Sequence, residues 1–249
     1  MKIINRLLWG GLFCAFLAAT QSLAHGNRWE TINDGAKVAI QRGDTAEAER
    51  LLKEALAEAG QENEKTPYRA MSLQNLALFY ASQEKHAAAA EFAQKAVEAW
   101  ENLLGPEHQQ VGTALSNLAL LYSHQEKYAE AEPYSRRALA IHEAALGTEH
   151  PQVGKDLHEL AATCRHQGKY GEAEPLYQRA LAIWEKALGP EHLAVAITLE
   201  DYSLLLRKTN RDAEAEKYEA RAQAIRTQLS SRPPSLTPPP PGSGSGHHH

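Results

Sequence analysis

The sequence LGPEH at residues 104–108 returns as LGTEH at 146–150 and as LGPEH at 188–192. Each copy begins 42 residues after the one before it. A fixed period of about 20 to 50 residues is typical of proteins that stack copies of one small structural unit. The spacing therefore predicts a repeat protein whose unit runs from one copy of this pentapeptide to the next.

The unit that begins at Leu104 predicts two amphipathic helices joined by a short turn. Apolar residues in its first half recur at i, i+3, i+4 and i+7, which places their side chains on one face of a helix. These residues are Leu115, Leu118, Ala119 and Tyr122. After SHQEK at 123–127, a second helical stripe contains Ala131, Ala138 and Ile141. The unit is therefore interpreted as a helix–turn–helix pair.

The pentapeptide fits the boundary between one helix pair and the next. Gly105 can take the left-handed conformation that ends a helix, and Pro106 suits the start of the following one. A histidine recurs at the same place as His108, His150 and His192. Neighbouring units lie about 8–10 Å apart, whereas zinc needs nitrogen ligands at about 2.0–2.1 Å. We therefore expect these histidines to hold the loop rather than to share a metal ion.

The same pattern continues in both directions along the chain. Downstream, residues 146–187 and 188–228 repeat it, the second more loosely. Upstream, one unit repeats it with NEKTP at 63–67 in place of the pentapeptide, and GDTAEAERLLKEAL at 43–56 matches the second helix of a shorter unit. The sequence thus predicts an all-α fold of about five helix pairs, in which small alanines allow close contact between helices.

Two stretches carry a family resemblance most clearly, SNLALLYSHQEKYAEAEPYSRRALAI at 116–141 and HELAATCRHQGKYGEAEPLYQRALAI at 158–183. In them the chain resembles a tetratricopeptide repeat protein, of the 42-residue type found in kinesin light chains and in many bacterial proteins. The resemblance covers about residues 29–229. It implies a right-handed α-solenoid with an extended concave face, and a function in non-catalytic protein–protein interaction.

The resemblance also implies where a protein or peptide partner binds. In this family the first helix of each pair lines the concave face, and the positions between its core residues contact the ligand. Asn75 and Asn117 carry both a donor and an acceptor, which suits the backbone of an extended peptide, while Leu78, Leu120 and Leu204 offer apolar contact. The candidate residues are Asn75, Leu78, Asn117, Leu120, His124, Lys155, His158, Arg165, His166, Leu204, Arg207 and Lys208.

Four of these candidates gather positive charge at one end of the concave face, namely Arg165, His166, Arg207 and Lys208. An acidic peptide or a chain-terminal carboxylate would suit that end. Glu159 and Asp201, however, stand where the family pattern prefers asparagine. Both would repel such a ligand unless a nearby cation pairs with them, with Lys155, Arg165 and Arg207 as the choices. The charge preference stays open, as does the alternative that these side chains are only a solvated surface.

The first 24 residues have the features of a secretory signal. Lys2 and Arg6 precede an apolar run at 7–19, and SLA at 22–24 fits a small-x-small cleavage site. The run is shorter than the roughly 20 residues that span a membrane. We therefore expect cleavage near Ala24 and a periplasmic or secreted protein.

Beyond the signal we expect a solenoid domain at 25–231 and a disordered tail at 232–249. The tail is rich in proline, glycine and serine, a composition that does not build a packed core. Its last residues, GSGSGHHH, are typical of a linker and a short His tag. A native metal-binding tail is the alternative.

The charge balance and the missing motifs argue against two classes of function, nucleic-acid binding and catalysis. The chain has 26 basic and 31 acidic residues, whereas nucleic-acid-binding surfaces are usually basic. The sequence has no His-Glu-x-x-His, no phosphate-binding glycine loop and no nucleophile elbow. Cys164 falls on a core stripe, where a cysteine packs as a small apolar residue. We expect no cofactor, no metal and no membrane span. The alternatives are self-assembly through the solenoid ends, giving a homo-oligomer or envelope structure, and an enzyme without a recognisable motif.

Overall fold

The structure is a computed structural model that describes residues 28–60 and 67–231 of the 249-residue chain. Within those ranges every regular element is a helix, which confirms the all-α class. The helices are α2 (Arg28–Arg42), α3 (Thr45–Glu58), α4 (Tyr68–Ser82), α5 (His86–Leu104), α6 (Gln109–His124), α7 (Tyr128–Leu146), α8 (Pro151–His166), α9 (Tyr170–Leu188), α10 (Leu193–Lys208) and α11 (Asp212–Ser231). The predicted signal at 1–24 and tail at 232–249 lie outside the described residues and stay predictions.

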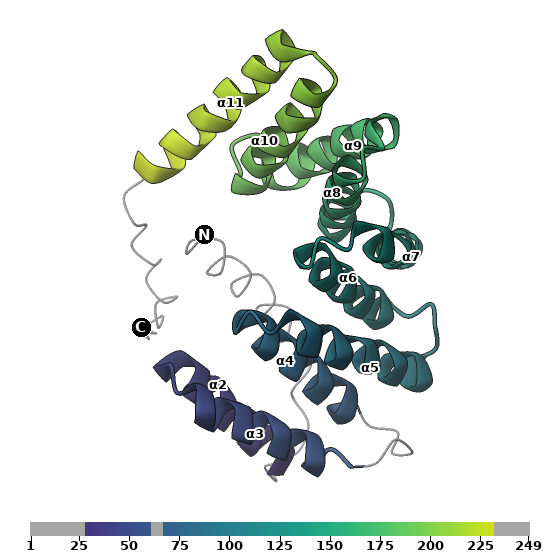
Figure 1. Cartoon of the computed structure of the whole chain (residues 1–249), viewed down its shortest axis with the longest axis vertical. Helices are drawn as coiled ribbons and strands as arrows, with labels where there is room; N and C mark the ends of the chain where they lie inside the picture. The colour runs from purple at the N-terminus through teal and green to yellow at the C-terminus, as the bar shows by residue number, and fades with distance from the viewer. Residues whose placement is uncertain (1–27, 61–66, 232–249) are drawn as a thin grey trace, which may run out of the picture.

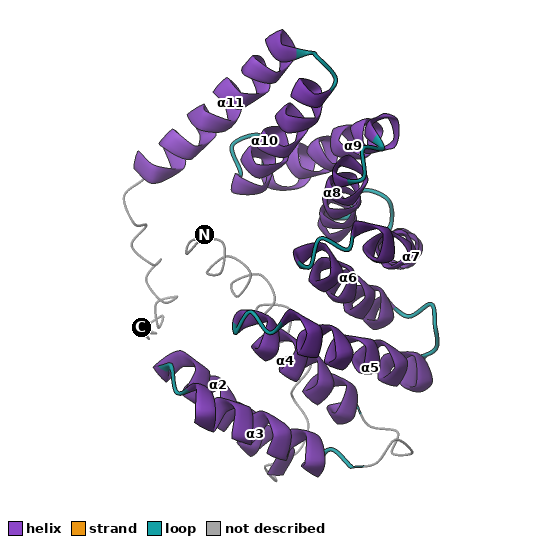
Figure 2. Ribbon diagram, viewed as in Figure 1, coloured by secondary structure: helices purple, strands orange, loops and turns teal. Residues whose placement is uncertain are grey.

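Consecutive helices in these ranges form five helix–turn–helix pairs that follow one another along an arc (Figure 1). Short loops join the helices, and the first helices α4 and α6 lie toward the inner side of the arc, with α5 and α7 outside them (Figure 2). This arrangement is the predicted solenoid. None of the described helices combines the length and apolar character that crossing a membrane requires.

Each pair turns on one residue in the left-handed backbone conformation. The φ angle is 76° at Gly43 and Gly168, 60° at Glu84 and Glu126, and 58° at Asn210. Glycine takes this conformation freely, whereas a side chain brings Cβ too close to the following carbonyl oxygen. The chain therefore reverses direction at the same point of every repeat, and the two helices of a pair can pack together.

The pentapeptide marks the boundary between pairs, as predicted. The φ angle is 87° at Gly105, 87° at Gly147 and 90° at Gly189. The Gly105 amide donates to the Glu101 carbonyl oxygen at 2.9 Å, which uses one of the last free carbonyls of α5. The glycine thus ends one pair.

The recurring histidines begin the next pair as helix N-caps. His108, His150 and His192 precede α6, α8 and α10, and each ring Nδ1 accepts a hydrogen bond from the backbone amide two residues further on. The N···N distances are 3.1, 3.1 and 3.2 Å. The bond satisfies one of the free amides at a helix start. The prediction that these histidines hold the loop is confirmed.

Small residues recur at one buried position of the second helices. Ala89, Ala131, Ala173 and Ala215 occupy one position of α5, α7, α9 and α11, and all four are fully buried. Cys164 on α8 is also fully buried, and burial raises the pKa of its thiol. A buried thiol held in its neutral form is a packing residue, as predicted.

An ion-pair ladder joins the outer helices α5, α7, α9 and α11. Its rungs are Arg137–Glu101 at 2.6 Å, Arg179–Glu143 at 2.7 Å and Arg221–Glu185 at 2.7 Å. Both positions of a rung advance by 42 residues from one rung to the next. The ladder therefore ties each pair to the one after it, on the side away from the inner face.

The last helix, α11, closes the solenoid with polar side chains. Two positions of the second helices pack toward the following pair, as Leu139 and His142 of α7 do toward α8. In the earlier second helices the first position is apolar, whereas α11 has a polar side chain there: the residues are Val97, Leu139, Leu181 and Gln223. The second position has a ring in the earlier helices and an arginine in α11: the residues are Trp100, His142, Trp184 and Arg226. Arg226 turns back to Glu200 of α10, with Nη2 to Oε2 at 2.6 Å.

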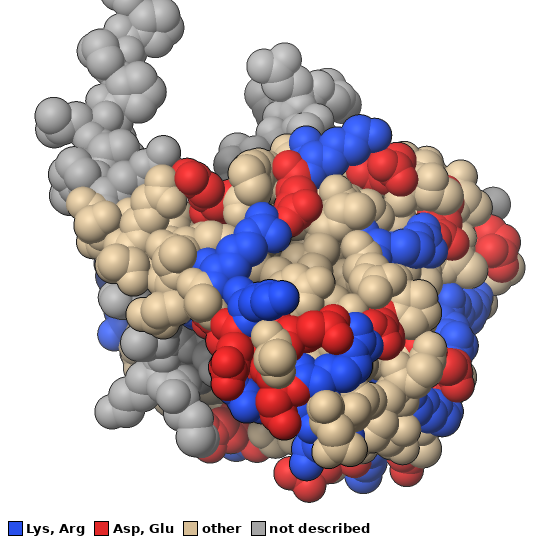
Figure 3. Space-filling view, turned by 90° about the horizontal axis from the view of Figure 1, so that it is seen from above, with Lys and Arg blue, Asp and Glu red and all other residues tan. Residues whose placement is uncertain are grey.

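A hollow of about 480 Å³ lies beside Gln223 and Arg226. Acidic and basic side chains are interspersed over this end of the molecule (Figure 3). A solenoid needs such a polar end to stay soluble. The described C-terminal end of the solenoid is therefore polar.

Candidate binding groove

The candidate site is the face of the first helices α4, α6, α8 and α10 that carries the candidate residues. This face follows the inner side of the arc of helices (Figure 1), and it is called the groove below because the family resemblance implies a concave face there. Each helix turns its apolar stripe into the core; in α6, Leu115 and Leu118 are 1% exposed. The candidate residues lie between the stripe positions, as the family resemblance implied. Leu78 and Leu120 are half-buried, and Leu204 is 46% exposed.

The α4 and α6 half of the groove is lined by neutral amides. Asn75 is half-buried and donates from Nδ2 to Oδ1 of Asn33 on α2 at 2.8 Å. Asn117 is only 8% exposed, so it lies deeper than a surface contact residue. Its Nδ2 has no hydrogen-bond partner among residues 28–60 and 67–231.

The free amide of Asn117 is unusual for a buried polar group. A buried donor without an acceptor costs about 1–3 kcal/mol, and folded proteins contain few of them. An acceptor brought from outside the chain, such as a peptide carbonyl, would remove that cost. Because this nitrogen has almost no exposed surface, an outside acceptor would reach it only after neighbouring side chains moved.

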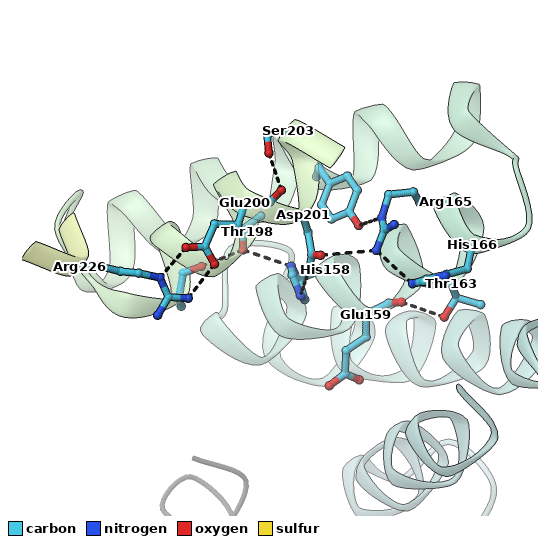
Figure 4. Close-up of polar contacts among 12 residues, drawn as sticks. His158, Glu159, Thr163, Arg165, His166, Thr198, Glu200, Asp201, Ser203 and Arg226 are labelled. Carbon is cyan, nitrogen blue, oxygen red and sulfur yellow. Dashed lines mark hydrogen bonds and ion pairs between the residues drawn. The ribbon is translucent and has the colours of Figure 1, made fainter. Parts of the chain in front are cut away.

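The α8 and α10 half is charged, and its charges pair with one another (Figure 4). Asp201 Oδ2 lies 3.3 Å from His158 Nε2, and Asp201 Oδ1 lies 3.4 Å from Arg165 Nη2. Arg165 also donates from Nε to the Tyr177 hydroxyl at 3.3 Å and from Nη2 to His166 Nε2 at 3.0 Å. Asp201 is thus held between two partners on α8.

Two further charged candidates, Lys155 and Arg207, also form ion pairs within the protein. Lys155 Nζ lies 3.6 Å from Glu159 Oε1, and Arg207 binds Glu219 of α11 at 2.7 Å. Lys208 is exposed. The pairing that relieves repulsion from Glu159 and Asp201 is therefore present. It also leaves the expected positive end largely neutralised, because Arg165 and Arg207 already face carboxylates.

The pKa values of the three groove histidines are lowered from their ordinary value. Burial lowers the pKa of His124, with a further contribution from the neighbouring His86. Burial also lowers the pKa of His158, which Asp201 only partly offsets, and the pKa of His166, which Arg165 lowers further. His166 stacks on Tyr128 with ring centroids 4.4 Å apart. These rings add aromatic surface rather than charge to the groove.

Sequence reasoning missed Asn33 and Glu219 as partners of candidate residues. Asn33 lies in the shorter first unit, so no repeated position marked it. Glu219 stands where α9 has Tyr177, and an alignment of α11 with α9 would have shown that substitution. The burial of Asn117 was not visible either, because the repeat pattern fixes a helix face but not the depth of a side chain.

One cluster has the residue types of a metal site but not a free ligand set. Glu132, Cys164 and Glu172 bring ligand atoms within 4.8 Å of one another. The Glu132 carboxylate, however, accepts from Lys169 at 2.5 Å and from Arg136 at 2.8 Å. The protein's own cations thus occupy the place that a metal ion would take.

These features define a class of protein, an α-solenoid of helix–turn–helix repeats. The sequence profile of the tetratricopeptide repeat family matches residues 30–102, 68–144, 110–164 and 156–228. The chain belongs to this family. A comparison with curated proteins found no match.

Several solved structures have the same fold. BtubC (BKLC) from P. vanneervenii matches with a TM-score of 0.73 and 24% identity, over 88% of this chain and 86% of that one. A putative kinesin light chain with nearly identical TPR-like repeats from Podosopora anserina matches with a TM-score of 0.69 and 25% identity, over 84% and 100%. YrrB, described as a TPR protein with an unusual peptide-binding site, matches with a TM-score of 0.54 and 16% identity, over 80% and 87%.

Proposed function

We propose that this protein is a non-catalytic scaffold that binds an extended segment of a protein partner in its groove. The tetratricopeptide repeat fold suggests an interaction scaffold, and YrrB is a structural neighbour described as having a peptide-binding site. The observation that carries the proposal is the buried, unpaired Nδ2 of Asn117 among the described residues. A carbonyl of the bound segment would accept from it once neighbouring side chains move to expose the atom, and Leu120 would contact an adjacent side chain.

The two halves of the groove have different tasks in this proposal. Asn75 and Asn117 bind main-chain groups, which gives affinity with little dependence on the partner's sequence. The paired charges on α8 and α10 make the other half selective, since a ligand must match an arrangement that is already neutral. We therefore expect a partner segment with no strong excess of acidic residues.

Affinity capture tests this proposal. The chain would be immobilised and exposed to a cell-envelope extract, and retained proteins would be identified by mass spectrometry. The Asn75→Ala/Asn117→Ala variant should retain the wild-type partner poorly. Each lost hydrogen bond should raise Kd by about tenfold, measured by titration with the identified segment.

A matched control separates binding from folding. Gln94→Ala/Asn102→Ala removes two exposed amides from the outer helix α5 and should leave binding unchanged. Circular dichroism should show equal helix content in all three proteins. A partner that is retained equally by the Asn75/Asn117 variant would rule out the groove as its binding site.

We also propose that the scaffold works outside the cytoplasm, in the periplasm of a Gram-negative bacterium. The support is the sequence alone, namely the basic start, the apolar run at 7–19 and the SLA site. Cell fractionation followed by N-terminal sequencing tests this directly. A mature N-terminus at His25 in the periplasmic fraction is the expected result, whereas a full-length cytoplasmic protein would refute it.

A further inference from the structure

A buried polar cluster separates the third helix pair from the fourth. His142 of α7 and Asp156 of α8 are 0% and 2% exposed, and Nδ1 lies 2.5 Å from Oδ2. The other carboxylate oxygen of Asp156 accepts from Ser116 Oγ of α6 at 2.8 Å and from Gln152 Nε2 at 3.2 Å. The cluster therefore joins three helices with hydrogen bonds where a solenoid normally has apolar packing.

The neighbouring junctions use different chemistry at the same two positions. The pair of residues is Trp100 and Ala114 one repeat earlier, His142 and Asp156 here, and Trp184 and Thr198 one repeat later. Both positions change together, from a large ring and a small residue to an imidazole and a carboxylate. The junction between α7 and α8 is therefore a local departure from the repeat.

The apolar core divides at the same place. One large cluster of buried side chains runs from Ala36 to Ile141, and a second runs from Val153 to Ile225 and includes Leu139 of α7, the buried apolar residue that crosses this junction; a third, small cluster lies within the first pair. Each repeat in a solenoid is stabilised chiefly by contact with its neighbours. A buried hydrogen-bonded polar cluster contributes less net stability than apolar residues of similar volume, because its polar groups lose their hydration. This junction should therefore couple its two neighbours less strongly than the tryptophan junctions do.

We propose that the solenoid consists of two cooperative units, α2–α7 and α8–α11, which open independently at the His142–Asp156 junction. Asn117 lies on the first unit and Arg165 on the second, so relative movement of the units changes the geometry of the groove between its neutral and charged halves. The inference does not depend on what the groove binds.

Native-state hydrogen exchange, read by mass spectrometry on the full chain, tests the proposal. Leu76 of α4 is fully buried, and Leu76→Ala should lower amide protection in α2–α7 by about thirtyfold or more. Protection in α8–α11 should change by less than about threefold. An equal loss of protection in both units would show that the solenoid opens as one body and would overturn the proposal.

Exchanging the junction residues gives the reciprocal test. His142→Trp/Asp156→Thr installs the residues of the next junction, and Gly112 leaves room for the ring as Gly154 does beside Trp184. In that background Leu76→Ala should reduce protection in both units together. Trp184→His/Thr198→Asp should add a boundary between α9 and α10. If an exchanged variant does not fold, the Leu76→Ala result in the original chain decides whether the solenoid has two units. If an exchanged variant folds but its regions of shared protection are those of the original chain, the polar cluster does not set the boundary between the units.

Discussion

At the scale of single residues, the turn inside each pair depends on one backbone angle. Gly168 has a φ of 76°, and a Cβ built on it meets no atom within 4 Å, so the cost of Gly168→Ala is backbone strain alone. We expect this substitution to lower the free energy of unfolding by about 1–2 kcal/mol. Gly171→Ala, three residues away inside α9, also meets no atom but should raise it by about 0.4–1 kcal/mol. Urea denaturation measures both; equal signs would contradict the argument.

A second prediction at this scale concerns the Glu132 carboxylate. Burial opposes its ionisation, but hydrogen bonds from Lys169, Arg136 and Gln167 outweigh burial and lower its pKa from 4.5 to about 2. A lowered pKa in the folded state stabilises the protein above pH 4.5, and this contribution is lost as the pH falls toward 2.

The comparison of wild type with Glu132→Gln isolates that contribution. Glu132→Gln should cost about 2 kcal/mol at pH 7, and the difference from wild type should shrink steadily below pH 4.5. The measurement is the free energy of unfolding across that pH range. A difference that does not vary with pH would show that the charge of Glu132 is unimportant.

At the scale of the helix, each first helix after a pentapeptide starts at a histidine cap. Removing the acceptor with His150→Ala should destabilise α8 by about 1 kcal/mol, whereas His150→Asn keeps an acceptor and should cost less. Thermal unfolding ranks the three proteins. Equal loss with alanine and asparagine would mean that the ring acts through packing and not through Nδ1.

Helices and turns were predictable because each depends on residues close in the chain. The repeat of Gly105 and His108 placed the boundaries between pairs, and the spacing of Leu115 and Leu118 identified the buried face. The first pair was predicted less well, because its turn residue Gly43 lies 41 residues before Glu84, one short of the 42-residue register. The pattern of nearby residues thus predicts where a helix lies, whereas the side-chain contacts of that helix depend on how successive repeats pack.

At the scale of the whole molecule, the polar face of α11 decides where the solenoid stops. Gln223→Leu/Arg226→Trp would restore the residues that α9 presents to the next pair. We expect this variant to self-associate with rising concentration, while wild type stays monomeric through this end. Sedimentation velocity measures both. Gln223→Ala/Arg226→Ala, which removes the polar groups without adding a large apolar surface, should remain monomeric.

The candidate groove was only partly predictable at this scale. The sequence placed Asn75, Asn117 and Arg165 on one face, because the face follows from helical periodicity. It did not show that Arg165 faces Asp201 or that Asn117 is buried. Those facts depend on the distance between successive first helices, which no single repeat encodes.

The ladder of Arg137, Arg179 and Arg221 with its glutamates has a consequence for the size of the molecule. Deleting residues 147–188 would join Leu146 to Gly189, regenerate the pentapeptide and bring Glu143 opposite Arg221. The ladder would survive with one rung fewer, since both ends of each rung keep the same register, whereas the His142–Asp156 cluster would lose its carboxylate. The length of the solenoid should therefore change only in steps of one 42-residue repeat. Removing or duplicating a repeat would shorten or lengthen the inner face that a partner can contact by the same step.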